Sequence, residues 1–267
     1  MKKQLLFLLP VILAIASCNL FDNHGKEVKV GNNEVFYKGE NVTKEDAENL
    51  GKFLTNVKWF SNDKPGSAQI ISENGTYTVR LVADLEKVDS ATRLNLWKLQ
   101  YDLSQEVFKG KPSKIVFADD KLKETESLSP IAKLEVGKGG IYYNSQAFSK
   151  EVVSQLATFL ESMTYMGGEN ESEVLLNKEA GGPVVRLIFE KEAAEKNEET
   201  ILPLLGYWQA VVQEDILKDQ KAALRLTSVQ YEDFKNVPAI TAEEKQAFKV
   251  ELGKMQQADS NAAATEE

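Results

Sequence analysis

The chain of 267 residues contains one cysteine, Cys18, and one histidine, His24, and this limits the chemistry that it can perform. Zinc sites built from Cys and His ligands and disulfide frameworks both need several such residues, so both are excluded. His24 lies in a short polar stretch without the nucleophile set of a catalytic triad, which favours a spacer residue. Gly-x-Ser-x-Gly, P-loop, Gly-x-Gly-x-x-Gly and His-Glu-x-x-His motifs are absent. We therefore predict no catalytic residue, no metal site and no cofactor.

Among the side chains that could act as catalytic acids or bases or as metal ligands, carboxylates are abundant. The neighbouring acids Asp119-Asp120 and Glu232-Asp233 each follow an expected strand, but neither has the alternating ligand spacing of an EF-hand loop. Acidic pairs in this position are usually solvated. Catalysis by two carboxylates far apart in the chain, as in glycosidases, leaves no local motif and stays open.

Cys18 closes an N-terminal segment with the pattern of a secretion signal. The segment starts with the positive residues Lys2 and Lys3, and an apolar run from Leu5 to Ala16 follows that is too short to span a bilayer. The run ends in Ile15-Ala16-Ser17-Cys18, which resembles the lipobox of bacterial lipoproteins. The resemblance covers the leader alone.

The resemblance implies that residues 1–17 are a signal peptide and residues 18–26 a tether. It also implies a diacylglyceryl group on the sulfur of Cys18 and acylation, for example by palmitate, of the new amine. Acyl chains contribute about 0.8 kcal/mol per buried methylene, so several chains anchor a protein firmly to a membrane. An ordinary signal peptide with an incidental cysteine is the alternative.

The location that follows is the bacterial cell envelope. Asn19 is not the aspartate that holds lipoproteins at the inner membrane in some enteric bacteria, which favours the outer membrane. The sequence favours neither its periplasmic nor its surface side. The net charge is −9, and it becomes −11 when Lys2 and Lys3 leave with the leader. An acidic chain without a Lys/Arg-rich run is unsuited to nucleic acid.

Two stretches of the chain repeat one another at a constant spacing of 106 residues, as from Val79 to Val185. This spacing is too long for a solenoid repeat and indicates two duplicated domains. Later in each copy the spacing grows to 109, as from Leu96 to Leu205, so the second copy contains an insertion. The matching segments are Val28-Lys29-Val30-Gly31 and Leu134-Glu135-Val136-Gly137, Val35-Phe36-Tyr37 and Ile141-Tyr142-Tyr143, Thr43-Lys44-Glu45 and Ser149-Lys150-Glu151, and Val79-Arg80-Leu81 and Val185-Arg186-Leu187.

Each copy reads as hairpin, helix, hairpin, helix and strand. Thr43 and Ser149 offer N-cap hydroxyls to the first helix of each copy, and Asn74-Gly75 is typical of a type I′ hairpin turn. We predict an α+β fold of two tandem duplicated domains. Each is expected to be an antiparallel sheet with two helices on one face, in the ferredoxin-like order with an extra N-terminal strand.

The predicted boundaries follow from these elements. Repeat domain 1 covers residues 27–122 and repeat domain 2 covers residues 133–236. A linker at 123–132 joins them, and residues 237–267 form a short helix, to about Gln257, and a disordered acidic tail.

Arg80 and Arg186 occupy equivalent points of the two copies, on the strand face opposite a Val-Leu pair. A guanidinium group recognises anions and carboxylates, so both are ligand candidates. The alternative, which we favour, is a solvated arginine or one paired with an acid on a neighbouring strand.

These patterns predict a membrane-anchored envelope lipoprotein that acts as a non-catalytic binding or assembly module, with a possible protein partner in the envelope. The alternative is a hydrolase of envelope polymers that uses carboxylates. A deep cleft with converging acids would favour the hydrolase, and an open face or shallow groove would favour the module.

Overall fold

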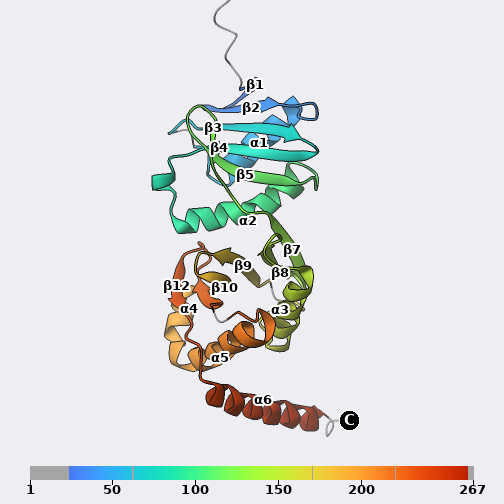
Figure 1. Ribbon diagram of the computed structural model, residues 1–267, viewed down its shortest axis with the longest axis vertical. Helices are drawn as coiled ribbons and strands as arrows, with labels where there is room; N and C mark the ends of the chain where they lie inside the picture. The colour runs from blue at the N-terminus through green and yellow to red at the C-terminus, as the bar shows by residue number, and fades with distance from the viewer. Residues whose placement is uncertain (1–23, 62, 170, 220, 264–267) are drawn as a thin grey trace, which may run out of the picture. The chain divides into compact units, whose positions relative to one another are not determined.

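The computed structural model describes residues 24–61, 63–169, 171–219 and 221–263. Cys18 and the expected leader lie outside these residues. The chain divides into two compact units, one with the described residues up to Ala83 and Leu103–Glu126, the other with Asp84–Asp102 and the described residues from Ser127 onward. Each contains one six-stranded sheet (Figure 1).

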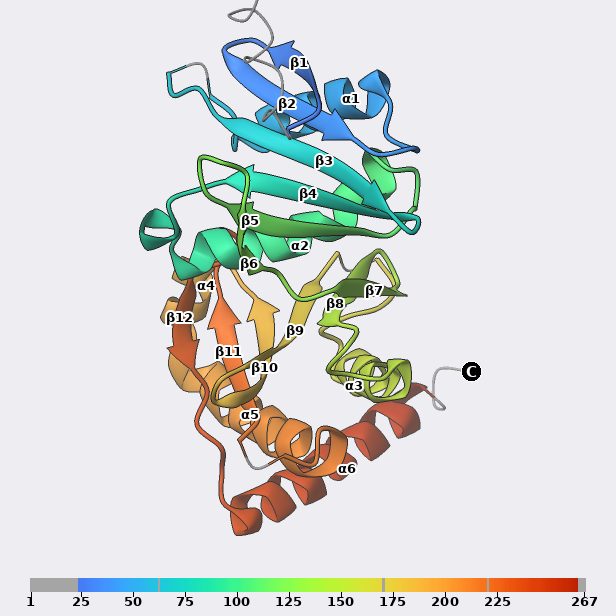
Figure 2. The ribbon, with the colours of Figure 1, turned by 45° about the horizontal axis from the view of Figure 1, so that its top comes forward.

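The first sheet contains its strands in chain order (Figure 2). The helix α1 (Lys44–Asn56) connects β2 to β3, and a short 3-10 turn (Leu85–Lys87) and α2 (Ser90–Glu106) connect β4 to β5. The strands are β1 (Lys26–Val30), β2 (Asn33–Lys38), β3 (Ser67–Glu73), β4 (Thr76–Val82), β5 (Ser113–Ala118) and β6 (Glu124–Ser127).

The second sheet follows the same plan, with more helix between its fourth and fifth strands. Its strands are β7 (Ile131–Val136), β8 (Gly139–Asn144), β9 (Glu173–Glu179), β10 (Gly182–Ile188), β11 (Ala223–Thr227) and β12 (Asp233–Asn236). Its helices are α3 (Lys150–Ser162), α4 (Lys191–Lys196), α5 (Glu198–Val211) with a π-helical end (Val212–Ile216), and α6 (Ala242–Ala263).

Both sheets are mixed. The strands joined by helices, β2 with β3 and β4 with β5, are parallel neighbours, as are β8 with β9 and β10 with β11. The α+β class and the tandem duplication are confirmed. The antiparallel sheet is wrong, because each helix returns the chain to the starting end of a strand and the next strand then pairs directly beside it, parallel to the first. The predicted order of elements along the chain, an extra strand followed by β-α-β-β-α-β, is present in both copies, with α4 added in the second and one further strand at the end of each.

One face of the second sheet carries the core of that unit. Alternate residues of its strands, such as Ile141, Val174 and Leu187, form one apolar cluster with Leu156 of α3 and Trp208 of α5. Both helices therefore cover the same face, as predicted. The strand pairs β8–β9 and β10–β11 run in opposite directions yet step the same way across the sheet, so their two helical crossovers have opposite hands. One of the two is consequently of the rare left-handed kind.

Local signals in the sequence are realised as predicted. The Thr43 hydroxyl accepts a hydrogen bond from the Asp46 amide at 3.1 Å, and the Asp46 carboxylate accepts one from the Thr43 amide at 2.8 Å. The Ser149 hydroxyl caps α3 by accepting a hydrogen bond from the Val152 amide at 3.4 Å, without a reciprocal bond. Asn74 and Gly75 both have positive φ, 50° and 78°, as a type I′ turn requires.

Two segments differ from expectation. The stretch 123–132, expected as a linker, contains β6 and the start of β7. As an edge strand, β6 needs no alternation of apolar residues, so its pattern is that of a polar loop. The last helix continues past Gln257 to Ala263, through a stretch in which three of six residues are alanine, the residue of highest helix propensity. Residues 264–267 of the expected disordered tail lie outside the described residues.

Candidate functional site

Arg80 lies on β4 and reaches across β5 to the edge strand β6. Its Nε and Nη2 atoms donate to the Glu124 carboxylate at 3.2 and 2.9 Å, and its Nη1 atom donates to the Gln69 side chain at 2.9 Å. The Arg80 side chain is 21% exposed. The acid partner of Arg80 therefore lies two strands away, on β6, and not on a strand next to β4 as expected.

The Arg186 side chain on β10 likewise extends across β11 to the edge strand β12 of the second sheet. Its Nε and Nη2 atoms donate to the two oxygens of Asp233 on β12, at 2.8 and 2.9 Å. Its Nη1 atom donates to Asn177 at 2.7 Å, and Nη2 also pairs with Glu179. Arg186 is 5% exposed, so the expectation of a solvated cation is wrong for this residue. Its polar partners come from β9, which lies beside β10, and from β12, two strands away.

A second arginine joins this group. Arg225 of β11 lies beside Arg186 in the sheet, and its Nη1 atom pairs with Asp233 at 2.9 Å and with Glu179 at 3.1 Å. The Thr227 hydroxyl donates to Asp233 at 2.7 Å. Arg186, Arg225, Glu179 and Asp233 are called the arginine network below. Its two positive and two negative charges balance.

The charge state of the arginine network is that of a structural ion cluster. Burial by itself raises the pKa of Asp233, but hydrogen bonds from Arg186 and Thr227 outweigh it and hold that pKa below its ordinary value. A catalytic acid needs the opposite shift. The arrangement therefore stabilises the polar face of the sheet and supplies no proton donor.

A second cluster surrounds the ammonium group of Lys98 on α2. Its Nζ atom lies 3.0 Å from the Glu173 carboxylate, and 5.1 and 5.8 Å from the ring centres of Tyr142 and Tyr231. Burial alone lowers the pKa of Lys98, but Tyr231 and Glu173 raise it above its ordinary value. Lys98 thus stays charged and attaches the first part of α2 to the second sheet. No sequence signal indicated this cluster, because its members come from separate elements.

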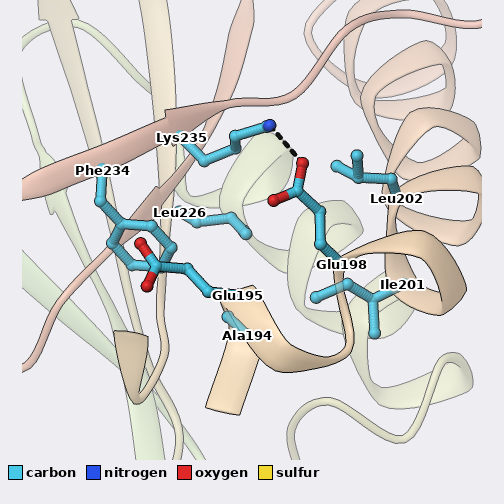
Figure 3. Close-up of a pocket in the computed structure, with 8 residues that line it drawn as sticks. All are labelled: Ala194, Glu195, Glu198, Ile201, Leu202, Leu226, Phe234 and Lys235. Atoms are coloured by element: carbon cyan, nitrogen blue, oxygen red, sulfur yellow. Dashed lines mark hydrogen bonds and ion pairs between the residues drawn. The ribbon is translucent and has the colours of Figure 1, made fainter. Parts of the chain in front are cut away.

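A pocket of about 200 Å³ lies at the edge of the second sheet (Figure 3). Leu226 of β11 and Phe234 of β12 form one side, and Ile201 and Leu202 of α5 line the other. Lys235 pairs with Glu198 across it. The remaining lining residues are Ala194 and Glu195 of α4.

A β-bulge in β12 builds the outer side of this pocket. Asp233 pairs with Thr227 and Lys235 pairs with Leu226, so Phe234 is the extra residue between them. A bulge lets consecutive side chains lie on similar sides of a strand, and here Phe234 and Lys235 both line the pocket while Asp233 joins the arginine network.

The first repeat lacks the parts that make this pocket. By the spacing of 109 residues, Thr125 and Glu126 stand where the second repeat has Phe234 and Lys235. A 3-10 turn of three residues replaces α4 in the connection. The sequence signal for the site is the insertion between the fourth strand and the second helix of the second copy. In the sequence it is visible as the change in spacing from 106 to 109 residues.

The other polar residues singled out from sequence have structural partners. The Asp119 carboxylate accepts hydrogen bonds from the amides of Lys121 and Lys123, so it closes a turn. The His24 ring packs against Phe36 with 5.3 Å between ring centres. In the described part of the chain, no three or more His, Cys, Asp or Glu residues are placed to hold a metal ion.

Among the helices of the described residues, none combines the length and apolar content needed to cross a membrane. Comparison with curated proteins and with solved structures gives no match. A family model, described as the AF_1994_N family N-terminal domain, matches the chain twice, at residues 27–129 and 133–239. The two matched segments agree with the internal duplication and cover most of the sequence. The chain therefore belongs to the AF_1994_N family and carries two copies of its N-terminal domain.

Proposed function

We propose that this protein is a lipid-anchored module of the bacterial envelope that binds a protein partner through its second repeat and carries out no catalysis. The anchor rests on the lipobox that ends in Cys18. The binding role rests on one observation, the pocket between β12 and the α4–α5 segment, where the first repeat has Thr125 in place of Phe234 and a 3-10 turn in place of α4.

The size of the pocket favours recognition of a side chain. Pockets for drug-sized molecules measure about 300–1,000 Å³, whereas an apolar cavity of about 150 Å³ holds a benzene molecule. A volume of about 200 Å³ therefore suits one apolar side chain of a partner. A polymer substrate would need a longer cleft.

The charged groups around the pocket also favour binding over catalysis. Glu198 is engaged by Lys235, and the acids of the arginine network are neutralised by their own arginines. Carboxylate chemistry needs one acid that holds a proton and a second that is free to act.

The hydrolase alternative has one observation in its favour, the presence of both Glu195 and Glu198 at the pocket. The variants Glu195→Gln and Glu198→Gln separate the two functions. Hydrolysis of purified envelope polymer by the native protein, lost in both variants, would establish the enzyme and overturn the module.

The proposal is tested with the lipidated protein in its native membrane. Cys18→Ala should abolish labelling by a fatty-acid probe and release the protein from the membrane fraction. Cross-linking of the wild-type protein in intact cells should recover a defined partner, and the recovery should fall in the Cys18→Ala strain. Unchanged acyl labelling in that strain would disprove the anchor.

A further inference from the structure

The pocket adjoins the open edge of the second sheet. β12 is the last strand of that sheet and pairs with β11 on one side. An edge strand has a row of backbone N–H and C=O groups directed away from its neighbour, and these groups can pair with another extended chain. The pocket and the unpaired side of the edge strand, both useful for peptide recognition, therefore meet at Phe234 and Lys235.

We propose that an extended segment of the partner adds to β12 as a further strand and places one apolar side chain in the pocket. This inference rests on the proposed binding function and names its partner class. In strand addition the backbone hydrogen bonds supply affinity, and pockets for alternate side chains supply specificity. Leu226, Phe234 and Lys235 all line the pocket, so a side chain of the added strand that is directed to this face would reach it.

The charges around the pocket select a basic segment. Residues 190–199, which include α4 and the start of α5, contain five glutamates and two lysines. One further lysine, Lys235, lies at the pocket and pairs with Glu198. The excess of acid attracts lysine or arginine side chains that flank the apolar residue, and it repels an acidic segment.

The first repeat provides an internal contrast. Its edge strand β6 has the sequence Glu124-Thr125-Glu126-Ser127, with negative charges directly on the edge and no apolar residue. Charged edge strands resist the addition of another chain. The second edge carries one charge of each sign, Asp233 and Lys235, and presents Phe234 beside an apolar pocket. The two edge strands therefore differ in net charge and in having a pocket for an anchoring side chain.

The test uses the full lipidated protein in nanodiscs of neutral phosphatidylcholine, so that a basic peptide does not bind the lipid. The probe is the capped peptide Lys-Val-Lys-Leu-Lys-Val, titrated by calorimetry. Its controls are Glu-Val-Glu-Leu-Glu-Val and a Lys-Val-Lys-Leu-Lys-Val peptide with methylated backbone nitrogens, which cannot form the ladder of hydrogen bonds. The basic peptide should bind at least about tenfold more tightly than either control.

Protein variants locate the site. Ala194→Leu fills the pocket, and Leu202→Gln makes its wall polar. Each should weaken binding of the basic peptide at least about tenfold, because a buried anchor contributes more than about 1 kcal/mol. Glu86→Gln, in the corresponding connection of the first repeat, is the matched control and should leave binding unchanged. If Ala194→Leu lowers the melting temperature, the result is decided by Leu202→Gln, because Leu202 is only partly buried.

Equal binding of the basic and acidic peptides, equal binding of the methylated peptide, or full binding by Leu202→Gln would each overturn the inference. Failure here is distinct from failure of the proposed function. If Leu202→Gln still cross-links to the native partner at the wild-type level, the partner binds elsewhere, and the anchored module remains while the strand-addition site does not.

Discussion

The polar faces of the two sheets show how one design diverged after duplication. Both copies place an arginine on the fourth strand and an acid on the sixth, as Arg80 with Glu124 and Arg186 with Asp233. In the first copy Val116 lies between them on β5, and at the equivalent place in the second copy lies Arg225. The second copy therefore has the arginine network where the first copy has one ion pair.

From this difference we expect burial, more than the pairing itself, to determine how much each arginine contributes to the free energy of unfolding. Arg80 is 21% exposed and its partner Glu124 is 40% exposed, so water screens the pair. The Arg186 side chain is 6% exposed, makes a two-point contact to Asp233 and also pairs with Asn177 and Glu179. Removing a buried partner leaves other charges uncompensated.

The largest expected effect follows from this contrast. Arg186→Ala should lower the free energy of unfolding by about 3–5 kcal/mol, because Asp233 and Glu179 then lose their main partner inside the protein. Urea unfolding followed by circular dichroism measures the change. A loss below about 1 kcal/mol, the scale of an exposed ion pair, would instead show that water replaces the guanidinium group.

A matched pair of core substitutions tests whether the two copies are equally sensitive. Leu50 of α1 and Leu156 of α3 are equivalent at the spacing of 106 residues, and both are fully buried. Leu50→Ala and Leu156→Ala should each lower the free energy of unfolding by about 2–5 kcal/mol. Two unfolding transitions, one affected by each variant, would support independent units. A single transition that both variants shift equally would instead show that the units unfold together.

The contacts of Lys98 that attach α2 to the second sheet are expected to contribute less to the free energy of unfolding than these core leucines. Lys98→Met keeps most of the side-chain volume and removes the charge next to Glu173 and the tyrosine rings. We expect a loss of about 1–2 kcal/mol, on the scale of a desolvated cation–π contact with one ion pair. Lys133→Met provides a control, because Lys133 also lies over the Tyr142 ring, at 5.3 Å, but pairs with Glu135, which is 63% exposed. Equal losses in the two variants would contradict a special role for Lys98.

The dependence of stability on acid pH should also differ between the ion pairs of the two copies. The pKa of Asp233 is held below its ordinary value in the folded state, so its contribution to stability is complete above about pH 4 and is lost as the pH falls through the lower, folded-state value. Asp233→Asn should therefore flatten the acid limb of the stability profile. Glu124→Gln, the equivalent change in the first copy, should leave that limb in place. Thermal melts between pH 2 and pH 7 give both profiles.

The smallest effect is expected for Arg80→Ala. Its ion pair is partly exposed, and such pairs contribute about 0–1 kcal/mol. The Gln69 side chain keeps a hydrogen bond to the His24 carbonyl at 2.7 Å after the change. A loss above about 2 kcal/mol in chemical unfolding would contradict the distinction between the two arginines.

Signals within one element were readable from the sequence. The duplication, the order of strands and helices, the caps at Thr43 and Ser149, and the turn at Asn74-Gly75 all depend on residues close together in the chain. Alternation along β4 and β10 also predicted which face carries each arginine. The AF_1994_N match then confirmed the two copies that spacing had indicated.

Properties that depend on distant partners were decided by the tertiary structure. Periodicity assigned all of α2 to the first repeat, whereas its residues up to Asp102 group with the second unit, where Trp97 donates to the Ser129 carbonyl at 3.0 Å. The sequence pattern also did not indicate the parallel pairing of neighbouring strands, the edge strand β6 or the burial of Arg186. A strand shows which of its faces is apolar, but which strand lies beside it depends on the path of the helix between them, and that path is set by packing in three dimensions. The pocket at Phe234 has the same origin, because it exists only where an insertion, a bulge and a sheet edge meet.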